Sequence, residues 1–432
     1  MQNLPETIFA VSSGSPPAAI AVIRISGPAA SQLLQTIAGR VPPPRRAVLA
    51  DLRSEAGDVL DTGMVLYMPG PASATGEDCA ELHVHGGRAV VRAVEQALGK
   101  IPAVRHAEAG EFTRRAFANG KLDLAQAEGL ADLLAAETEL QRLNAQAMAG
   151  GLFSRMVTQW RKDLLQLSAE VEAVLDFSDE EDAEQMPLDF AARLEVMSNR
   201  LQEWLNGPQT ETLKEGFRVV LAGPPNSGKS SLFNALVQED AAIITPVAGT
   251  TRDVLQRPVA IDGVPFLFID TAGLRDDTTD AVELVGIERA YNEVVKADLV
   301  LWLGAEGEGP AEAWEIGAKS DLDNFAKKAP DFSVSAVTLA GVRELREALR
   351  IVAAAAMPKP GQIALSRFQR TALHASSQEV IAAHEMLGNR SADLLILAEF
   401  LRRARVELDR LLGNVSTEDM LDALFGNFCI GK

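Results

Sequence analysis

The sequence predicts a multidomain protein of mixed α/β and α+β class, in which an α/β domain interrupts a helical domain. The chain has 432 residues, and at about 150 residues per domain this length gives a prior of two to four domains. The periodicity of the apolar residues changes near residues 120, 215 and 357, and each change indicates a different kind of secondary structure. These changes place the expected domain boundaries.

Residues 1–120 are typical of an α+β domain. Short β-type runs at residues 19–25 and 63–67 are punctuated by Gly and Pro, whereas residues 88–98 have helical spacing. Residues 121–214 then carry apolar side chains at intervals of three and four, such as Leu164, Leu167 and Val171, with almost no internal Pro or Gly. This second pattern predicts the first part of a helical domain.

Residues 215–357 switch to alternating strands and helices, which is the pattern of a parallel α/β sheet. A Pro-Lys-Pro-Gly stretch at residues 358–361 ends this domain, and helical periodicity resumes over residues 365–424. Residues 358–432 are therefore expected to form the second part of the helical domain.

Charge and cysteine content restrict the compartment and the partners. The chain has 41 basic and 60 acidic residues and a net charge of -19, which disfavours long-range attraction to nucleic acid or to an anionic membrane. No apolar run reaches the length of a membrane span, and no basic leader precedes an apolar segment. Two cysteines, Cys79 and Cys429, are too few for a disulfide framework. We expect a cytoplasmic protein that contacts no membrane.

The strongest motif is the stretch Gly-Pro-Pro-Asn-Ser-Gly-Lys-Ser at residues 223–230, which matches the phosphate-binding loop pattern G-x-x-x-x-G-K-S at every position. An apolar run at residues 217–222 precedes it and a helical segment at residues 231–237 follows it. In such a loop the glycines let backbone N–H groups converge on phosphate oxygens. Lys229 would neutralise the β- and γ-phosphates, and the Ser230 hydroxyl would bind Mg²⁺.

Two downstream motifs indicate a guanine-nucleotide switch protein. Asp270-Thr271-Ala272-Gly273 follows the strand-like residues 265–269, so that the carboxylate would hold Mg²⁺ through water and the Gly273 N–H would sense the γ-phosphate. Between the two loops, residues 249–253 read Gly-Thr-Thr-Arg-Asp, and a threonine hydroxyl there would complete the magnesium shell. The order and spacing of these loops are those of GTP-binding switch proteins.

The expected guanine-binding segment departs from the usual N-K-x-D pattern. Its best match is Ala318-Lys319-Ser320-Asp321, followed by Ser335-Ala336 as a loop that would contact the base oxygen. Asp321 would still accept from the two donors on guanine and reject adenine, which has no such pair. The alternative is that Asp321 is an ordinary surface carboxylate. In addition, the segment from residue 302 to 318 is short for a strand–helix–strand connection.

Further stretches match one family across the whole chain. They comprise Arg-Ile-Ser-Gly at residues 24–27, Gly-Glu-Phe-Thr-Arg-Arg-Ala-Phe at 110–117, Asn-Gly-Lys-Leu-Asp-Leu at 119–124, the loops at 249–253 and 270–273, and the terminal Phe-Cys-Ile-Gly-Lys at 428–432. On these motifs the chain resembles the MnmE (TrmE) family of bacterial GTPases that modify the wobble uridine of tRNA. The terminal pentapeptide and the inserted GTPase domain are highly specific in combination.

The resemblance implies the following organisation and reaction. Residues 1–120 would form a folate-binding-like domain that makes the homodimer, and residues 215–357 would form a Ras-like P-loop G domain inserted into the helical domain. With a flavin-dependent partner of the MnmG (GidA) type, the protein would modify carbon 5 of uridine 34 in tRNA. A tetrahydrofolate derivative, 5-formyl- or 5,10-methylene-tetrahydrofolate, would supply the carbon. GTP hydrolysis would need Mg²⁺ and K⁺, and tRNA would be bound weakly or through the partner.

The resemblance also implies site residues. Ser230 and Thr251 would bind Mg²⁺, and the K⁺ ligands would be Asn226, Thr245, Val247 and Thr250. Catalysis would involve Asn226, Glu283 as the residue that orients water, and Cys429 in the modification chemistry, although the apolar neighbours of Cys429 favour a buried position. Folate would contact Arg24, Glu81, Lys121 and Lys432. The nucleotide would contact Asn226, Ser227, Gly228, Lys229, Ser230, Ser231, Thr245, Pro246, Val247, Ala248, Gly249, Thr250, Thr251, Asp270, Thr271, Ala272, Gly273, Lys319, Asp321, Ser335 and Ala336.

Three alternatives remain open. Cys79, His83 and His85 offer zinc-binding side chains within one strand-like segment, but packing within a strand or exposure to solvent is the favoured interpretation. Arg402, Arg403 and Arg405 form the best local basic cluster for RNA. Finally, the G-domain motifs also suit a regulatory switch module that controls a protein partner without modification chemistry of its own.

Overall fold

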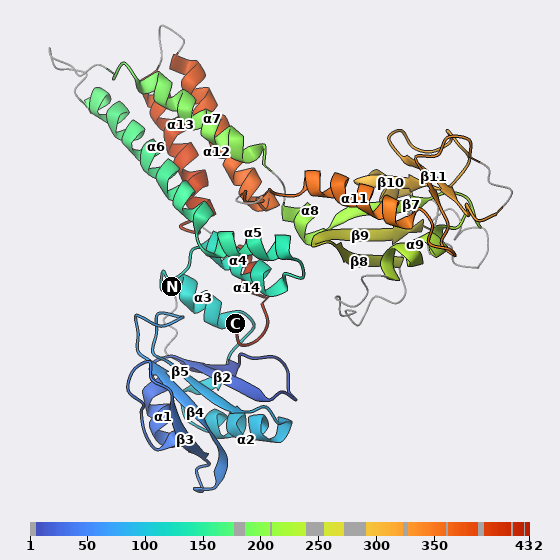
Figure 1. Ribbon diagram of the computed structural model, residues 1–432. Helices are drawn as coiled ribbons and strands as arrows, with labels where there is room; N and C mark the ends of the chain where they lie inside the picture. The colour runs from blue at the N-terminus through green and yellow to red at the C-terminus, as the bar shows by residue number, and fades with distance from the viewer. Residues whose placement is uncertain are drawn as a thin grey trace, which may run out of the picture. The chain divides into compact units, whose positions relative to one another are not determined.

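The computed structural model describes residues 6–176, 186–207, 210–238, 255–271, 291–322, 327–359, 362–387, 393–415, 418–426 and 428–432 (Figure 1). Its contacts divide the chain into two compact units. The N-terminal unit comprises Met1–Ala131 and Asp409–Lys432, and the central unit comprises Asp132–Leu408. In the part of the chain that is described, no helix is both long and apolar enough to cross a bilayer.

A six-stranded sheet organises the N-terminal unit, with strand order β3-β4-β5-β2-β1-β6. Neighbouring strands are antiparallel except for the parallel pair β1 and β6. The elements are β1 (Thr7–Val11), β2 (Ile20–Ser26), α1 (Ala30–Ala38), β3 (Val48–Arg53), β4 (Val59–Met68), β5 (Cys79–His85), α2 (Arg88–Gly99), β6 (Val104–His106), α3 (Glu111–Ala118), α4 (Leu124–Ala135) and α14 (Glu418–Gly426).

The two faces of this sheet have different surroundings. On one face, Ile23 and Ile25 of β2 pack in a core that includes Leu33 of α1 and Val94 of α2. Because side chains alternate along a strand, Arg24 and Ser26 point to the other face. At that face Phe112 of α3 packs with Ile8 and Ala10 of β1. Part of the second face is therefore covered by α3, while Arg24 beside it is only half-buried.

The C-terminal residues return to the N-terminal sheet. Ile430 makes a β-bridge with Ala109, and the Ser12 hydroxyl donates a 2.7 Å hydrogen bond to the Gly431 carbonyl. Gly431 has φ +96°, and a Cβ at this position would lie 2.1 Å from the Val11 carbonyl oxygen. A larger residue would not fit, so the glycine lets the chain end dock against β1.

The helical part of the central unit precedes and follows its sheet. Its helices are α5 (Glu139–Ala149), α6 (Leu152–Asp176), α7 (Phe190–Leu205), α8 (Thr210–Glu215), α12 (Arg367–Leu387) and α13 (Leu394–Leu411). Phe153 and Trp160 of α6 contact Trp204 of α7, with ring centroids 5.4 and 5.6 Å away. The Gln202 amide donates to the Ser377 hydroxyl of α12, and the Ser376 hydroxyl donates to the Ala404 carbonyl of α13. Helices α6, α7, α12 and α13 therefore pack together (Figure 1).

The sheet of the central unit has strand order β12-β11-β10-β7-β9-β8. Its elements are β7 (Phe217–Ala222), α9 (Lys229–Gln238), β8 (Leu255–Ile261), β9 (Val264–Asp270), β10 (Leu299–Trp302), β11 (Trp314–Ala318), β12 (Phe332–Val334) and α11 (Val342–Ala356). Leu236 of α9 and Leu345 of α11 are buried with Val219 and Leu301 of the sheet. The predicted class is confirmed, since an α/β sheet lies between two runs of helices and follows an α+β domain.

The prediction that this sheet is parallel is wrong at one edge. Strands β8 and β9 pair antiparallel, with Ile261 opposite Val264. The two residues between them, Asp262 and Gly263, have φ values of 48° and 80°. This Asp-Gly turn closes a two-residue hairpin, whose twist matches that of antiparallel strands.

Candidate functional site

The loop at residues 223–230 connects β7 to α9, as the motif requires. Gly223 has φ +146°, and a Cβ on it would lie 2.9 Å from the Gly304 backbone nitrogen. Gly228 has φ +102°, and Asn226, which is not a glycine, has φ 61°. The chain therefore turns sharply three times before α9 begins, a conformation that exposes backbone N–H groups in the loop.

Lys229 is held inside this loop. Its ammonium donates to the carbonyl oxygens of Gly223 at 2.9 Å and Pro224 at 2.8 Å, and the residue is only 5% exposed. As the first residue of α9, it also stands at the positive end of a helix dipole. The loop thus places a positive charge and a helix N-terminus where a phosphate chain would bind.

The predicted magnesium residues lie at the ends of neighbouring elements. Ser230 is exposed in the first turn of α9. Asp270 ends β9, pairs in register with Leu221 of β7, and is fully buried. The next residue, Thr271, donates from its hydroxyl to the Leu221 carbonyl at 2.8 Å. These contacts bring Asp270 close to the start of the loop at residues 223–230.

The segment expected to read the base also reaches this loop. Lys319, with φ 62°, donates from its ammonium to the Asn226 carbonyl at 2.7 Å. Asp321 is exposed, as both interpretations of this carboxylate allow. Ala318 lies next to Gly228, with its Cβ 3.5 Å from where a Cβ on that glycine would be, but it has no polar group to contribute. In the described residues Lys319 therefore supplies the polar contact between the two segments.

The second base loop is well ordered by its own hydrogen bonds. The Ser335 hydroxyl accepts from the backbone N–H groups of Val337 and Thr338 at 3.3 and 3.1 Å. Ser335 is fully buried and Ala336 is half-buried at the end of β12. The short connection between β10 and β11 contains turns and no helix, in agreement with its length.

Many predicted nucleotide, cation and catalytic residues lie outside the described residues. They are Thr245, Pro246, Val247, Ala248, Gly249, Thr250, Thr251, Ala272, Gly273 and Glu283. The roles assigned to them stay predictions.

In the N-terminal unit, two of the predicted folate residues form an ion pair on the second face of the sheet. Arg24 and Glu81 are register partners on β2 and β5, and the guanidinium donates to one carboxylate oxygen at 3.0 and 3.2 Å. His83 Nε2 lies 3.2 Å from the other oxygen. The Arg24 guanidinium also lies 6.0 Å from the centroid of the Phe112 ring. Neither member of the pair is fully buried, since their side chains are 25% and 17% exposed.

The other two predicted folate residues lie near different parts of the N-terminal sheet. Lys121 donates to the Pro71 carbonyl at 3.0 Å, in the loop that joins β4 and β5. Lys432 follows Gly431, which docks against Val11. Val11 pairs with Ile23, whereas the β4–β5 loop is bonded to Ser26. Ile23 and Ser26 are three residues apart along β2, which corresponds to about 10 Å of extended chain.

The cysteines occupy different environments. Cys429 is exposed, so the expectation that its apolar neighbours bury it is wrong. Phe428 alone of these neighbours is buried, against Phe425 and Ala127, while Ile430 is 63% exposed. The tail therefore anchors through Phe428 and leaves the thiol accessible.

The zinc interpretation of Cys79, His83 and His85 gains no support. Cys79 is buried with its sulfur 3.1 Å from the Thr75 hydroxyl, and His85 Nδ1 lies 2.8 Å from Asp61. Across the ranges that are described, no group of three or more His, Cys, Asp or Glu side chains is arranged to hold a metal. Cys79 packs inside the strand pair, whereas the His85 side chain is 72% exposed to solvent.

The arginine cluster proposed for RNA is partly neutralised. Arg402 and Arg403 both pair with Glu399, at 2.7 and 2.8 Å. All three side chains are solvent-exposed, so these pairs are weak and the arginines can exchange partners.

Sequence reasoning missed a buried arginine, Arg115 of α3, whose side chain is 1% exposed. It pairs with Glu77 and Glu111, each at 2.9 Å. Burial alone would raise the pKa of Glu111, but hydrogen bonds from Arg105, the Glu108 N–H and Arg115 lower it below its usual range. Two sequence signals were available: Arg115 lies at helical spacing from Phe112, on the face expected to be buried, and four residues after Glu111.

Comparisons with known proteins cover nearly the whole chain. A family model described as the GTP-binding protein TrmE N-terminus matches residues 7–121, and one described as the MnmE helical domain matches residues 124–429. A protein of Erythrobacter litoralis (strain HTCC2594) named tRNA modification GTPase MnmE is 56% identical over 428 residues, which cover 99% of this chain and 100% of that protein. A protein of the same name from Novosphingobium aromaticivorans is 55% identical over 444 residues, with 99% and 100% covered.

Among solved structures, the G domain of the T. maritima FeoB iron transporter is 27% identical and covers 32% of this chain and 98% of its own. Its TM-score is 0.22, which is too low to support a conclusion.

Proposed function

Since the chain belongs to the MnmE family, we propose that it is a GTPase that acts in tRNA modification. The observation that carries the GTPase activity is the loop at residues 223–230, which holds the Lys229 ammonium between the Gly223 and Pro224 carbonyl oxygens at the start of α9. A triphosphate in this loop would receive backbone N–H groups, the ammonium and the helix dipole together. Asp321 and the loop at Ser335 and Ala336 would select guanine.

We propose that Mg²⁺ and K⁺ assist hydrolysis. Mg²⁺ would be held by Ser230 and Thr251, with Asp270 reaching it through water, and K⁺ by Asn226 together with Thr245, Val247 and Thr250. Oxygen ligands suit both cations, and the exposed Asn226 at the loop offers one. Both cations would offset the negative charge of the reacting phosphates. Glu283 would orient the attacking water.

A tetrahydrofolate derivative is the proposed one-carbon donor, bound by the N-terminal unit. The chemistry of the residues present fits such a ligand. The Glu81 carboxylate can accept from the amino and ring N–H donors of a pterin, while Lys121 and Lys432 suit the carboxylates of its tail. The Arg24–Glu81 pair is accessible at 25% and 17%, so a ligand can reach it.

The wider reaction is proposed from the resemblance to the family. We propose a cytoplasmic homodimer that joins residues 1–120 of two chains and works with a flavin-dependent partner of the MnmG (GidA) type on carbon 5 of uridine 34. Residues 121–214 and 358–432 would form its helical domain and residues 215–357 its G domain. Cys429 would take part in the modification, and its exposure supports access to a substrate. The relatives' shared name favours this enzyme over a switch module that performs no modification.

The cation requirement gives a direct test of the proposed hydrolysis. We expect GTP turnover by the full chain to be at least about tenfold faster in K⁺ than in Na⁺ at equal ionic strength, because the bound cation offsets transition-state charge. The matched variant is Asn226→Gly, since glycine tolerates the φ of 61° at this position. It should lose the difference between the salts. Equal wild-type rates in the two salts would contradict the role of Asn226.

A further inference from the structure

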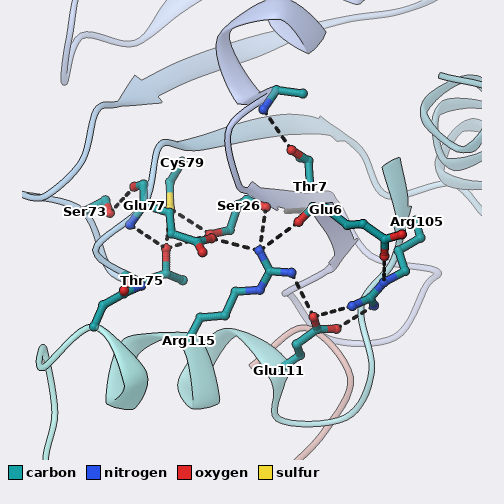
Figure 2. A network of polar contacts seen from close by, with 12 residues as sticks. Glu6, Thr7, Ser26, Ser73, Thr75, Glu77, Cys79, Arg105, Glu111 and Arg115 are labelled. Atoms are coloured by element: carbon teal, nitrogen blue, oxygen red, sulfur yellow. Dashed lines mark hydrogen bonds and ion pairs between the residues drawn. The ribbon is translucent and has the colours of Figure 1, made fainter. Parts of the chain in front are cut away.

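A buried charged network holds α3 against the sheet of the N-terminal unit (Figure 2). The Arg115 guanidinium donates to Glu111 Oε1 and to Glu77 Oε2, each at 2.9 Å, and to the Glu6 carbonyl at 3.0 Å. Glu111 is further bound by Arg105 at 2.7 and 2.8 Å. At 1% exposure, the two terminal nitrogens of Arg115 are bonded to these fixed partners and not to water, while its Nε is buried and has no hydrogen-bond partner among the described residues. The network therefore defines one position of α3.

The network continues into the strands that carry the Arg24–Glu81 pair. Glu77 Oε2 accepts from the Ser26 hydroxyl at 2.8 Å, and Ser26 Oγ lies 2.7 Å from Thr75 Oγ1. Ser26 and Cys79 are register partners, and the next pair on the same face is Arg24 with Glu81. Arg115 is therefore connected through Glu77 and Ser26 to the end of β2, two residues from Arg24.

Helix α3 also lies beside Arg24, one of the predicted folate residues. Phe112 is three residues before Arg115, which places both on one face of the helix. The Phe112 ring is buried at 3% exposure and lies 6.0 Å from the Arg24 guanidinium. A shift of α3 would therefore move the aromatic surface that Arg24 rests on.

The residues after α3 connect it to Lys121. The Asn119 amide donates to the Thr75 carbonyl at 2.8 Å, and the Lys121 ammonium donates to the Pro71 carbonyl at 3.0 Å. Both acceptors belong to the β4–β5 loop, which Glu77 ties to Arg115. The buried Arg115 guanidinium is thus connected both to α3 and to the β4–β5 loop, whose Pro71 carbonyl accepts from Lys121.

We propose that Arg115 is a positioning residue for the folate site, an inference that rests on the proposed function of the N-terminal unit. It touches no ligand. Its planar guanidinium holds α3 and the β4–β5 loop together through Glu111 and Glu77. This arrangement would keep Arg24, Glu81 and Lys121 at the separations that one folate ligand requires. Lysine would keep the charge but could not bridge Glu77 and Glu111 in the same plane.

The test measures binding of 5-formyltetrahydrofolate to the full-length protein by titration calorimetry. Arg115→Lys should weaken binding roughly tenfold, in the range found for residues that hold ligand-binding groups in place. GTP affinity, which depends on residues of the central unit, should not change. The matched control is Arg114→Lys, because Arg114 is the adjacent residue of α3, is 41% exposed and pairs with Asp422. This control should bind the folate like the wild type.

A double-variant cycle separates positioning from general damage. Each single variant should weaken folate binding by some factor. If Arg115 acts through Lys121, the double variant Arg115→Lys with Lys121→Ala should weaken folate binding by a factor smaller than the product of the two single factors. Multiplicative losses would overturn the proposal, as would wild-type affinity in a folded Arg115→Lys protein. If that protein does not fold, Glu77→Gln decides, since Glu77 is 23% exposed: roughly tenfold weaker binding supports the proposal and unchanged binding overturns it. A wild-type protein that binds no folate would instead refute the proposed folate function itself.

Discussion

Replacing Lys229 with alanine should lower the affinity for GTP by about 100-fold or more, because hydrogen bonds to charged groups contribute about 1.5–3 kcal/mol each. The ammonium is buried in the loop and already bonded to the Gly223 and Pro224 carbonyl oxygens. The ammonium is therefore held at the loop that would bind the triphosphate before the nucleotide arrives. The affinity is measured at equilibrium with a fluorescent GTP analogue in the presence of Mg²⁺.

The matched control for this substitution is Lys296→Ala, which removes an exposed lysine of the same unit. It should leave the GTP affinity unchanged. Circular dichroism of both variants checks that α9 and its sheet remain folded. If Lys229→Ala bound GTP as tightly as the wild type, the loop at residues 223–230 would not be the phosphate site.

The second large effect concerns the stability of the N-terminal unit. Glu111→Gln should lower its free energy of unfolding by about 3 kcal/mol, because removing one member of a buried ion pair leaves its partner uncompensated. Glu111 is 6% exposed and binds Arg105 and Arg115. Hydrogen exchange of the amides in β2 and α3 reports this loss locally in the full chain.

The pH dependence of the same variant follows from the lowered pKa of Glu111. A carboxylate with a lowered pKa in the folded state stabilises the fold above its ordinary pKa, and this contribution is lost as the pH falls through the folded-state value. Wild-type and Glu111→Gln proteins should therefore converge in stability in acid. The control Glu108→Gln, which alters an exposed side chain, should exchange like the wild type. If the amides of β2 and α3 in Glu111→Gln were as well protected from hydrogen exchange near neutral pH as in the wild type, the network would contribute little stability.

Local patterns were sufficient to predict the fold class. The spacing of Leu164, Leu167 and Val171 predicted a helix whose buried stripe these residues form in α6. The glycines and Lys229 predicted a strand–loop–helix unit that the structure contains. By contrast, the alternation of strands and helices does not indicate the antiparallel edge strand, which depends on the two-residue Asp262-Gly263 turn.

The long-range part of the buried network could not be predicted, because Glu6 and Glu77 are far from Arg115 in sequence, whereas the Glu111–Arg115 pair follows the i,i+4 spacing of a helix. Arg115 meets the Glu6 carbonyl across 109 residues and Glu77 across 38. No periodicity within one segment indicates which of many carboxylates will face a given arginine. The exposure of Cys429 could not be predicted for a related reason, since the residues that hold the tail on either side of it, among them Ala127, Ala109 and Ser12, are far from it in sequence.

The central claim is that this chain binds and hydrolyses a guanine nucleotide in the loop at residues 223–230. The most direct measurement is the equilibrium binding of GTP and of ATP to the full chain with Mg²⁺ and K⁺, with release of phosphate followed on the same samples. We expect GTP to bind at least about tenfold more tightly than ATP, because Asp321 would be left unpaired against adenine, and GTP to be hydrolysed. Binding of neither nucleotide, or equal binding of both, would contradict this claim.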